Sequence, residues 1–425
     1  MLRMVGSWLA ALALVVSVAI GKSALAQPTF SVEGTGTSLT RLSLALVPGD
    51  GMSRPSMLQI ARPMQQALLS SGFFSIGILP PNVSNAPQNW QSGGSAYLVT
   101  LQVSSLSVNR RAVAIEITDG SFGGERFTRQ LEIEGGELFD IGSAAADVVY
   151  QYFLDREGYF TSRIVYVRDA HSGGRRSFEI VSSDLFGNDA RVLVTSRSEL
   201  LSPKVSPDGA HLVWVGIRGD RPHLFWKSMS GGSARRIFND KLIRFSPTFD
   251  SAGNLYYTKI IKGNSDIYRT SLSSRRERRL TSNPSIETAP SVSSTANSLL
   301  YISDSSGRQR VVRQGLDGGG RQFVGQQRGA YGSPAWAPDG QSIAFTRQSQ
   351  GQFSIGTFDP ATGEEKQLST SFFEEHPIWA NNSKVIIFER AARGGGSGLW
   401  QVDAETSHLH RLPIQGNARD PSWLN

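Results

Sequence analysis

The stretch "SPKVSPDGAHLVWVG", Ser202 to Gly216, contains two prolines four residues apart, a Pro-Asp-Gly turn signal and an apolar run. Such a stretch is typical of a short strand, a tight turn and a second strand. A similar stretch, "SPAWAPDGQSIAFTR", stands at Ser333 to Arg347. Two copies of one hairpin motif in a chain of 425 residues indicate an internal repeat.

The first proline of this motif recurs through the second half of the chain at intervals of 44, 43, 44, 43 and 44 residues. The six prolines are Pro203, Pro247, Pro290, Pro334, Pro377 and Pro421. An apolar or aromatic residue follows each proline by two positions, and short apolar strands follow the first five prolines. A unit of about 44 residues with four short strands is typical of a β-propeller blade, and blades must stack in a ring to bury both faces.

The two ends of the repeat indicate how the ring closes. The strand-like segment "RIVYVR", residues 163–168, has no such proline upstream, and the last motif, "DPSWLN", ends the chain without a following strand. The two halves would complete one blade, so the sequence predicts a six-bladed propeller over residues 159–425, closed by the C-terminal strand. We expect Trp336, Trp379 and Trp423 to form core between blades rather than a ligand platform.

Residues 27–158 lack the repeat and predict a small α/β domain. The segment "RLSLALVPG" predicts a buried strand, and the segments "YLVTLQVSSL", "AVAIEITD" and "RFTRQLEIE" alternate like strands. The segment "SMLQIARPMQQALLSSG" predicts a helix that Ser56 would cap. Pro63 would kink that helix or mark its start. A second helix is predicted at "LFDIGSAAADVVYQYFLDRE", because its apolar residues recur on one face. The prediction is thus two helices against one sheet.

The first 26 residues have the features of a secretory signal peptide. Arg3 precedes an apolar run from Trp8 to Ile20, and "ALA" at residues 24–26 predicts cleavage after Ala26. The alternative is a membrane anchor, but this run falls short of the roughly 20 apolar residues that span a bilayer. We therefore expect an exported protein with no membrane-spanning segment.

Composition and motifs argue against several function classes. The formal charge of +7 comes from basic residues scattered through turns, which favours solvated positions over a nucleic-acid surface. The chain has no cysteine. It has no Walker A motif, because Val16 stands where the first glycine before Gly21-Lys22-Ser23 would be, and it has no G-x-S-x-G elbow and no H-E-x-x-H. The cluster Glu374-Glu375-His376 is predicted to be a solvated turn rather than a metal site, so we expect neither an enzyme nor a cofactor.

Taken together, the leader, the α/β domain and the six-bladed propeller ending in "PSW" resemble the TolB family, the periplasmic component of the Tol-Pal system. The segments "GSAAADVVYQYFLDREGYFTSRIVYV", "LSTSFFEEHPIW" and "HRLPIQGNARDPSWLN" resemble the family's domain junction and its last two blades. The resemblance implies a periplasmic, monomeric binding protein that supports outer-membrane integrity and cell division.

The resemblance also implies two partners. The lipoprotein Pal would bind one mouth of the propeller, at loops just before the inner strands. The corresponding residues are Arg244, Phe245, Ser246, Glu287, Thr288, Ala289, Gly332, Ser333, Glu375, His376, Arg419 and Asp420. TolA would bind the N-terminal segment, which includes Gln27, Phe30 and Val32 and is expected to act as a partner-responsive switch. The alternative for this N-terminal segment is a tail without a partner. Alternatives for the whole chain are a propeller-type periplasmic enzyme and a carbohydrate-binding propeller.

Overall fold

The structure, a computed structural model, describes residues 39–80, 87–120, 124–172, 174–326 and 329–424. The chain divides into two compact units, Met1–Thr161 and Ser162–Asn425. The predicted leader and the predicted switch at Gln27, Phe30 and Val32 lie outside the described residues. Among the residues that are described, no helix combines the length and apolar character needed to cross a membrane.

The first unit is an α/β fold, as the sequence predicts, with one five-stranded sheet in the order β2-β1-β3-β4-β5. Its strands are β1 (Thr40–Pro48), β2 (Phe74–Ile78), β3 (Tyr97–Ser105), β4 (Arg110–Asp119) and β5 (Arg126–Glu134). β1 pairs in parallel with β2 and β3, whereas β3, β4 and β5 are antiparallel. The two predicted helices are α1 (Arg54–Ser70) and α3 (Leu138–Leu154), and a short helix, α2 (Pro87–Gln91), was not anticipated.

The start of α1 differs from the prediction. Ser53 is the N-cap, and its hydroxyl accepts a hydrogen bond from the backbone N–H of Ser56. Ser56 therefore lies inside the first turn, because Pro55 fits the first positions of a helix and lets the helix begin earlier. Pro63 stands within the helix and does not mark its start.

Close packing joins α1 to α3 at a glycine. A Cβ atom added at Gly142 of α3 would lie 2.2 Å from the carbonyl oxygen of Ile60 in α1. Farther along α3, the carboxylate of the partly buried Asp147 accepts hydrogen bonds from the N–H groups of Phe160 and Thr161. Burial raises the pKa of Asp147 to about 6 although these hydrogen bonds act in the opposite direction.

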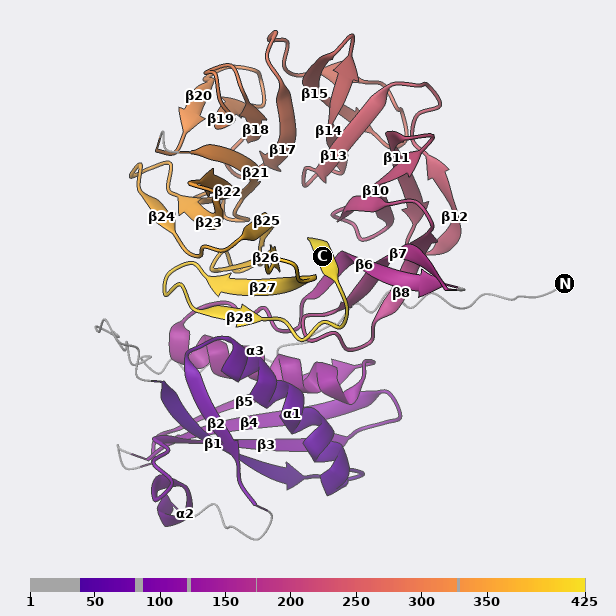
Figure 1. The fold of residues 1–425 in the computed structure, drawn as a ribbon. Coiled ribbons are helices and arrows are strands. Elements are labelled where there is room, and N and C mark those ends of the chain that lie inside the picture. The colour runs from indigo at the N-terminus through magenta and orange to yellow at the C-terminus, as the bar shows by residue number, and fades with distance from the viewer. Residues whose placement is uncertain (1–38, 81–86, 121–123, 173, 327–328, 425) are drawn as a thin grey trace, which may run out of the picture. The chain divides into compact units, whose positions relative to one another are not determined.

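The second unit is the predicted six-bladed propeller, with six four-stranded antiparallel sheets (Figure 1). From the inner to the outer strand, the sheets are β29 (Ala418–Leu424), β6 (Arg163–Ser172), β7 (Arg175–Asp184), β8 (Arg191–Ser196); β9 (Leu200–Val205), β10 (His211–Arg218), β11 (Arg221–Ser228), β12 (Gly231–Arg236); β13 (Ile243–Phe249), β14 (Asn254–Ile261), β15 (Asn264–Ser271), β16 (Arg278–Arg279); β17 (Glu287–Ser293), β18 (Ser298–Ser303), β19 (Arg310–Gly315), β20 (Gln322–Val324); β21 (Ala330–Trp336), β22 (Ile343–Ser349), β23 (Gln352–Phe358), β24 (Glu365–Gln367); and β25 (Phe373–Trp379), β26 (Val385–Ala391), β27 (Ser397–Asp403), β28 (Leu409–Arg411).

The C-terminal strand closes the ring as the sequence predicts. β29 pairs antiparallel with β6, and Trp423 stands opposite Ile164 while Arg419 stands opposite Val167. Figure 1 shows this end of the chain, in yellow, beside β6. The first and last segments of the propeller thus share one sheet, which ties its ends together by strand pairing rather than by a disulfide.

The core lies between successive blades. Trp336 is buried with Leu300 and Ile302 of the preceding blade and with Ile343 of its own blade. Trp379 repeats this packing one blade later. Both tryptophans are inter-blade core, as predicted. Trp423, near the end of β29, is only half-buried.

Candidate functional site

The inner strand of every blade carries a bulge at the repeated proline. The pairing with the next strand shifts at this point in all six blades. The residue just before each proline has a φ between 44° and 55°, which is uncommon for residues other than glycine. We call these six residues the preproline ring: Ser202, Ser246, Ala289, Ser333, His376 and Asp420. A bulge lets the strand contain a proline, which cannot donate a hydrogen bond to the ladder.

This geometry corrects one expectation about the predicted site. The sequence placed the twelve candidate residues in loops before the inner strands, whereas the structure places them within the strands β13, β17, β21, β25 and β29. The bulge preserves the strand on both sides of the proline, which a sequence pattern alone does not reveal. Glu374-Glu375-His376 likewise lies in β25 rather than in a solvated turn.

The preproline ring surrounds the centre of the propeller. All six of its members line a cavity of about 350 Å³, together with residues of the inner strands as far as the turns at Pro207 and Pro338. Trp336, Trp379 and Trp423 contribute to the wall, so these tryptophans also face the cavity, which the sequence prediction had excluded. Lys204 places an amine there. The cavity therefore combines apolar walls with a few polar groups, which is typical of a binding site.

Two of the predicted residues face away from this cavity. Arg244, three positions before its proline, is 2% exposed and binds two carboxylates. Its Nη1 and Nη2 atoms donate to Asp240 at 2.6 and 2.8 Å, and its Nε and Nη2 atoms donate to Glu277 at 2.9 and 3.1 Å. Lys259 and Tyr257 also bind Glu277. The charge of Arg244 is thus neutralised within the blade.

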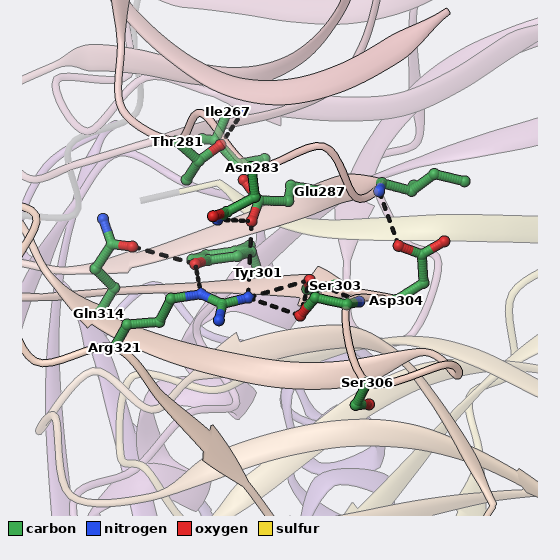
Figure 2. A network of polar contacts seen from close by, with 12 residues as sticks. Ile267, Thr281, Asn283, Glu287, Tyr301, Ser303, Asp304, Ser306, Gln314 and Arg321 are labelled. Carbon is green, nitrogen blue, oxygen red and sulfur yellow. Dashed lines mark hydrogen bonds and ion pairs between the residues drawn. The ribbon is translucent and has the colours of Figure 1, made fainter.

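Glu287 holds the same position in the next blade and is 0% exposed. Figure 2 shows its carboxylate between Asn283 and the guanidinium of Arg321. The amide of Asn283 donates to Glu287 Oε1 at 2.6 Å, and Arg321 Nη2 lies 3.9 Å from the same oxygen. Arg321 Nε donates to the hydroxyl of Tyr301 at 3.1 Å. Burial raises the pKa of Glu287, because these partners compensate only part of the desolvation.

The two networks are charge-reversed copies of each other. Arg244 pairs with Glu277 in one blade, and Glu287 pairs with Arg321 in the next, so the cation and the anion have exchanged strands. A tyrosine of the second strand contacts the outer partner in both blades. In these two blades, the residue three positions before the proline therefore joins the inner strand to the outer edge of its own blade.

The five predicted residues two positions before a proline are half-buried, and none of them lines the central cavity. They are Phe245, Thr288, Gly332, Glu375 and Arg419. Arg419 forms an ion pair of 3.3 Å with Glu199, which precedes the inner strand of the neighbouring blade. These residues form a rim beside the preproline ring.

A polar cluster stands where the last blade meets the closing strand. His376 Nδ1 lies 3.2 Å from Asp420 Oδ1 and 3.6 Å from Glu389 Oε2, and its Nε2 atom lies 3.9 Å from Glu375. Desolvation alone would lower the pKa of His376, but the carboxylates of Asp420, Glu389 and Glu375 outweigh it and raise this pKa to about 9.

Comparison with known proteins identifies the family of this fold. A family model described as TolB beta propeller domain matches residues 150–425. The chain belongs to the TolB beta propeller domain family. A crystal structure of TolB from Acinetobacter baumannii has a TM-score of 0.78 at 22% identity and covers 91% of this chain and 97% of that one. That similarity establishes a shared fold.

Two curated relatives named Tol-Pal system protein TolB are similar to part of this TolB-family chain. The protein from Gluconobacter oxydans is 28% identical over 291 residues, which are 67% of this chain and 64% of the relative. The protein from Anaeromyxobacter dehalogenans is 27% identical over 300 residues, which are 66% of each chain. The chain thus spans slightly less than two thirds of the length of these relatives.

The sequence prediction missed several residues of the TolB-family site. The repeat would have identified Ser202, because it stands 44 positions before Ser246. Lys204 follows the first proline directly, yet no charge pattern marks it. Glu389 stands opposite Glu375 across the ladder, where the equivalent residue of the preceding blade is Thr346. A carboxylate in place of threonine was a signal, since these two positions are 43 residues apart, as are Pro334 and Pro377, but only strand pairing places Glu389 opposite Glu375.

Proposed function

We propose that this protein is a periplasmic binding protein of the Tol-Pal system and not an enzyme. The leader of residues 1–26 would be removed after Ala26, which leaves an N-terminal domain of residues 27–158 and the propeller of residues 159–425. Pal is the proposed partner of one mouth of the propeller, and TolA is the proposed partner of the N-terminal segment. Membership of the TolB propeller family carries the proposal.

The geometry supports a docking role for the mouth that contains the preproline ring. Ser246, Ala289, Ser333, His376 and Asp420 surround the cavity, and the rim residues are partly accessible beside them. We assign direct partner contact to these two sets. Because Arg244 and Glu287 are buried, we assign them a positioning role, in which they hold the inner strands that present the contact residues.

The test is a titration of purified Pal against the mature protein by calorimetry. The variants Phe245→Ala and Thr288→Arg change the rim without removing a buried ion pair, and the matched control Asp339→Arg changes a turn at the opposite end of an inner strand. Truncating a central contact at an interface costs about 2 kcal/mol or more, which corresponds to roughly 30-fold in affinity. An equal loss from both mouths, or from neither, would contradict the proposed site.

The proposed role of the N-terminal segment needs a separate test. A form that starts at Arg41 lacks Gln27, Phe30 and Val32 and should lose TolA binding. If docking of the segment is coupled to Pal binding, Pal affinity should also change by about 5–150-fold, the usual range of coupling between two sites. Unchanged Pal affinity together with intact TolA binding would reduce the segment to a tail without a partner.

A further inference from the structure

The polar cluster at the ring closure combines side chains from both sides of the seam. His376 comes from β25 and Glu389 from β26, both in the last blade, whereas Asp420 comes from β29, the strand that closes the first blade. One ligand atom from each residue can be chosen so that all three lie within 4.8 Å of one another. Any ion held by all three would therefore bridge the two ends of the propeller.

The spacing of these atoms suits a small tetrahedral ion. His376 Nδ1 lies 3.2 Å from Asp420 Oδ1 and 3.6 Å from Glu389 Oε2. Nitrogen and oxygen ligands bind Zn²⁺ at about 2.0–2.2 Å, so tetrahedral ligand atoms stand about 3.3–3.6 Å apart. The two distances from the histidine nitrogen to the carboxylates match this spacing, and the carboxylate oxygens of the set lie within 4.8 Å of each other.

The cluster also leaves two buried polar groups without hydrogen bonds. Asp420 is 4% exposed and, among the described residues, accepts no hydrogen bond; its close ionic contact is with His376. The Nδ1 atom of His376 is buried and has no hydrogen-bond partner in the described part of the chain. Lys204, a partly buried residue, also lines this cavity and forms no ion pair within 4.0 Å among the described residues. Asp420 and the Nδ1 atom of His376 are thus held by ionic contacts without a hydrogen bond, and buried polar groups that lack hydrogen bonds are costly unless something else binds them.

Neighbouring side chains support the candidate ligands as they would in a metal site. The hydroxyl of Ser397 donates to Glu389 Oε1 at 2.9 Å, which leaves Oε2 directed to the cluster. Glu375 Oε2 lies 3.9 Å from His376 Nε2, the ring nitrogen on the other side from the cluster. Metal-binding histidines usually have a carboxylate or carbonyl at the second ring nitrogen, and metal-binding carboxylates are usually hydrogen-bonded.

We propose that His376, Glu389 and Asp420 bind one divalent transition-metal ion of the zinc class, which cross-links the last blade to the closing strand. One imidazole and two carboxylates suit such an ion, whereas Ca²⁺ takes six to eight oxygen ligands. Three protein ligands leave the fourth position open toward the central cavity. The proposal does not depend on the proposed partners, because it concerns the isolated protein.

The experiment titrates ZnCl₂ into untagged, EDTA-treated mature protein by calorimetry and records the melting temperature in parallel. We expect one saturable site and a higher melting temperature with Zn²⁺. The variants His376→Asn and Asp420→Asn should lose at least 100-fold in affinity, and asparagine tolerates the positive φ of both positions. Ser397→Ala should weaken binding by about 10–100-fold, the usual effect of losing a group that orients a ligand. The control His171→Asn removes an exposed histidine outside the cluster.

Three results would overturn the proposal. They are the absence of saturable Zn²⁺ binding, unchanged affinity in both ligand variants, and binding of Ca²⁺ as tight as that of Zn²⁺. Circular dichroism without metal checks that the variants fold. If neither ligand variant folds, the Zn²⁺ affinity of Ser397→Ala decides the question, because this change removes only one hydroxyl. Unchanged Zn²⁺ affinity in Ser397→Ala would contradict the proposed orientation of Glu389.

Discussion

Replacing Arg244 with methionine should destabilise the propeller strongly without touching the cavity. The guanidinium is almost fully buried and donates four hydrogen bonds to Asp240 and Glu277, and it also lies 3.9 Å from the ring centre of Phe238. Methionine fills a similar volume but leaves the carboxylate of Glu277 with fewer partners. The substitution therefore measures the contribution of the buried ion pairs to stability while the packing volume of the side chain stays similar.

The magnitude follows from the surroundings of the two carboxylates. Removing one partner of a buried ion pair costs about 3–5 kcal/mol. Asp240 is half-exposed and can be solvated, and Glu277 keeps Lys259 and Tyr257, so we expect the lower end, about 3 kcal/mol. For a unit of this size, each kcal/mol lowers the melting temperature by roughly 2–4 °C, which predicts a decrease of about 6–12 °C.

Thermal unfolding followed by tryptophan fluorescence measures this effect, because all but two of the eight tryptophans lie in residues 162–425. Arg276→Met, an exposed arginine of the same segment, is the matched control and should change little. Arg244→Lys should fall between the two, since lysine cannot bind two carboxylates in fork geometry. A loss below about 1 kcal/mol for Arg244→Met, the value of a surface pair, would refute the reasoning.

Three further predictions concern the closing strand and the first unit. Deleting residues 417–425 should cost more than the roughly 3–5 kcal/mol of a single large core truncation, because the first blade loses its inner strand, and an unchanged melting temperature would contradict closure. The folded-state pKa of Asp147, about 6, lies above the value of 3.8 that an unperturbed aspartate has, so the folded state binds this proton more tightly. The contribution of Asp147 to stability should be greatest below pH 4 and should be lost, by about 3 kcal/mol, as the pH rises through 6, so the difference in stability between the parent and Asp147→Asn should change over this range in denaturant titrations followed by helix circular dichroism. Gly142→Ala should destabilise the same unit by about 1–3 kcal/mol, because the added Cβ would collide with the backbone of Ile60, and this cost exceeds the gain from the higher helix propensity of alanine. Gly77→Ala is the control and should be nearly neutral, because its Cβ would meet nothing within 4 Å.

The sequence by itself determined the number of blades and the way the ring closes. Prolines and turn signals act through the local backbone, and six prolines at intervals of 43 or 44 residues fix the period of the strands. The unmatched segments at residues 163–168 and 420–425 then leave one blade to be completed by strand pairing. Apolar alternation and helical periodicity were likewise sufficient for the α/β unit, although they did not reveal the short α2 and β2.

Only the tertiary structure decided which candidate residues face the cavity. The bulge at each proline directs Ser246 and His376 toward the centre. Arg244 and Glu287 each stand two positions before the preproline residue of their blade, and their side chains form buried ion pairs instead. A charged residue near a proline looks the same in sequence whether its partner is solvent or a carboxylate 33 positions away, as Glu277 is from Arg244. The cluster of His376, Glu389 and Asp420 exists because two strands of one blade and the closing strand of another converge there, and that convergence is a property of the closed ring.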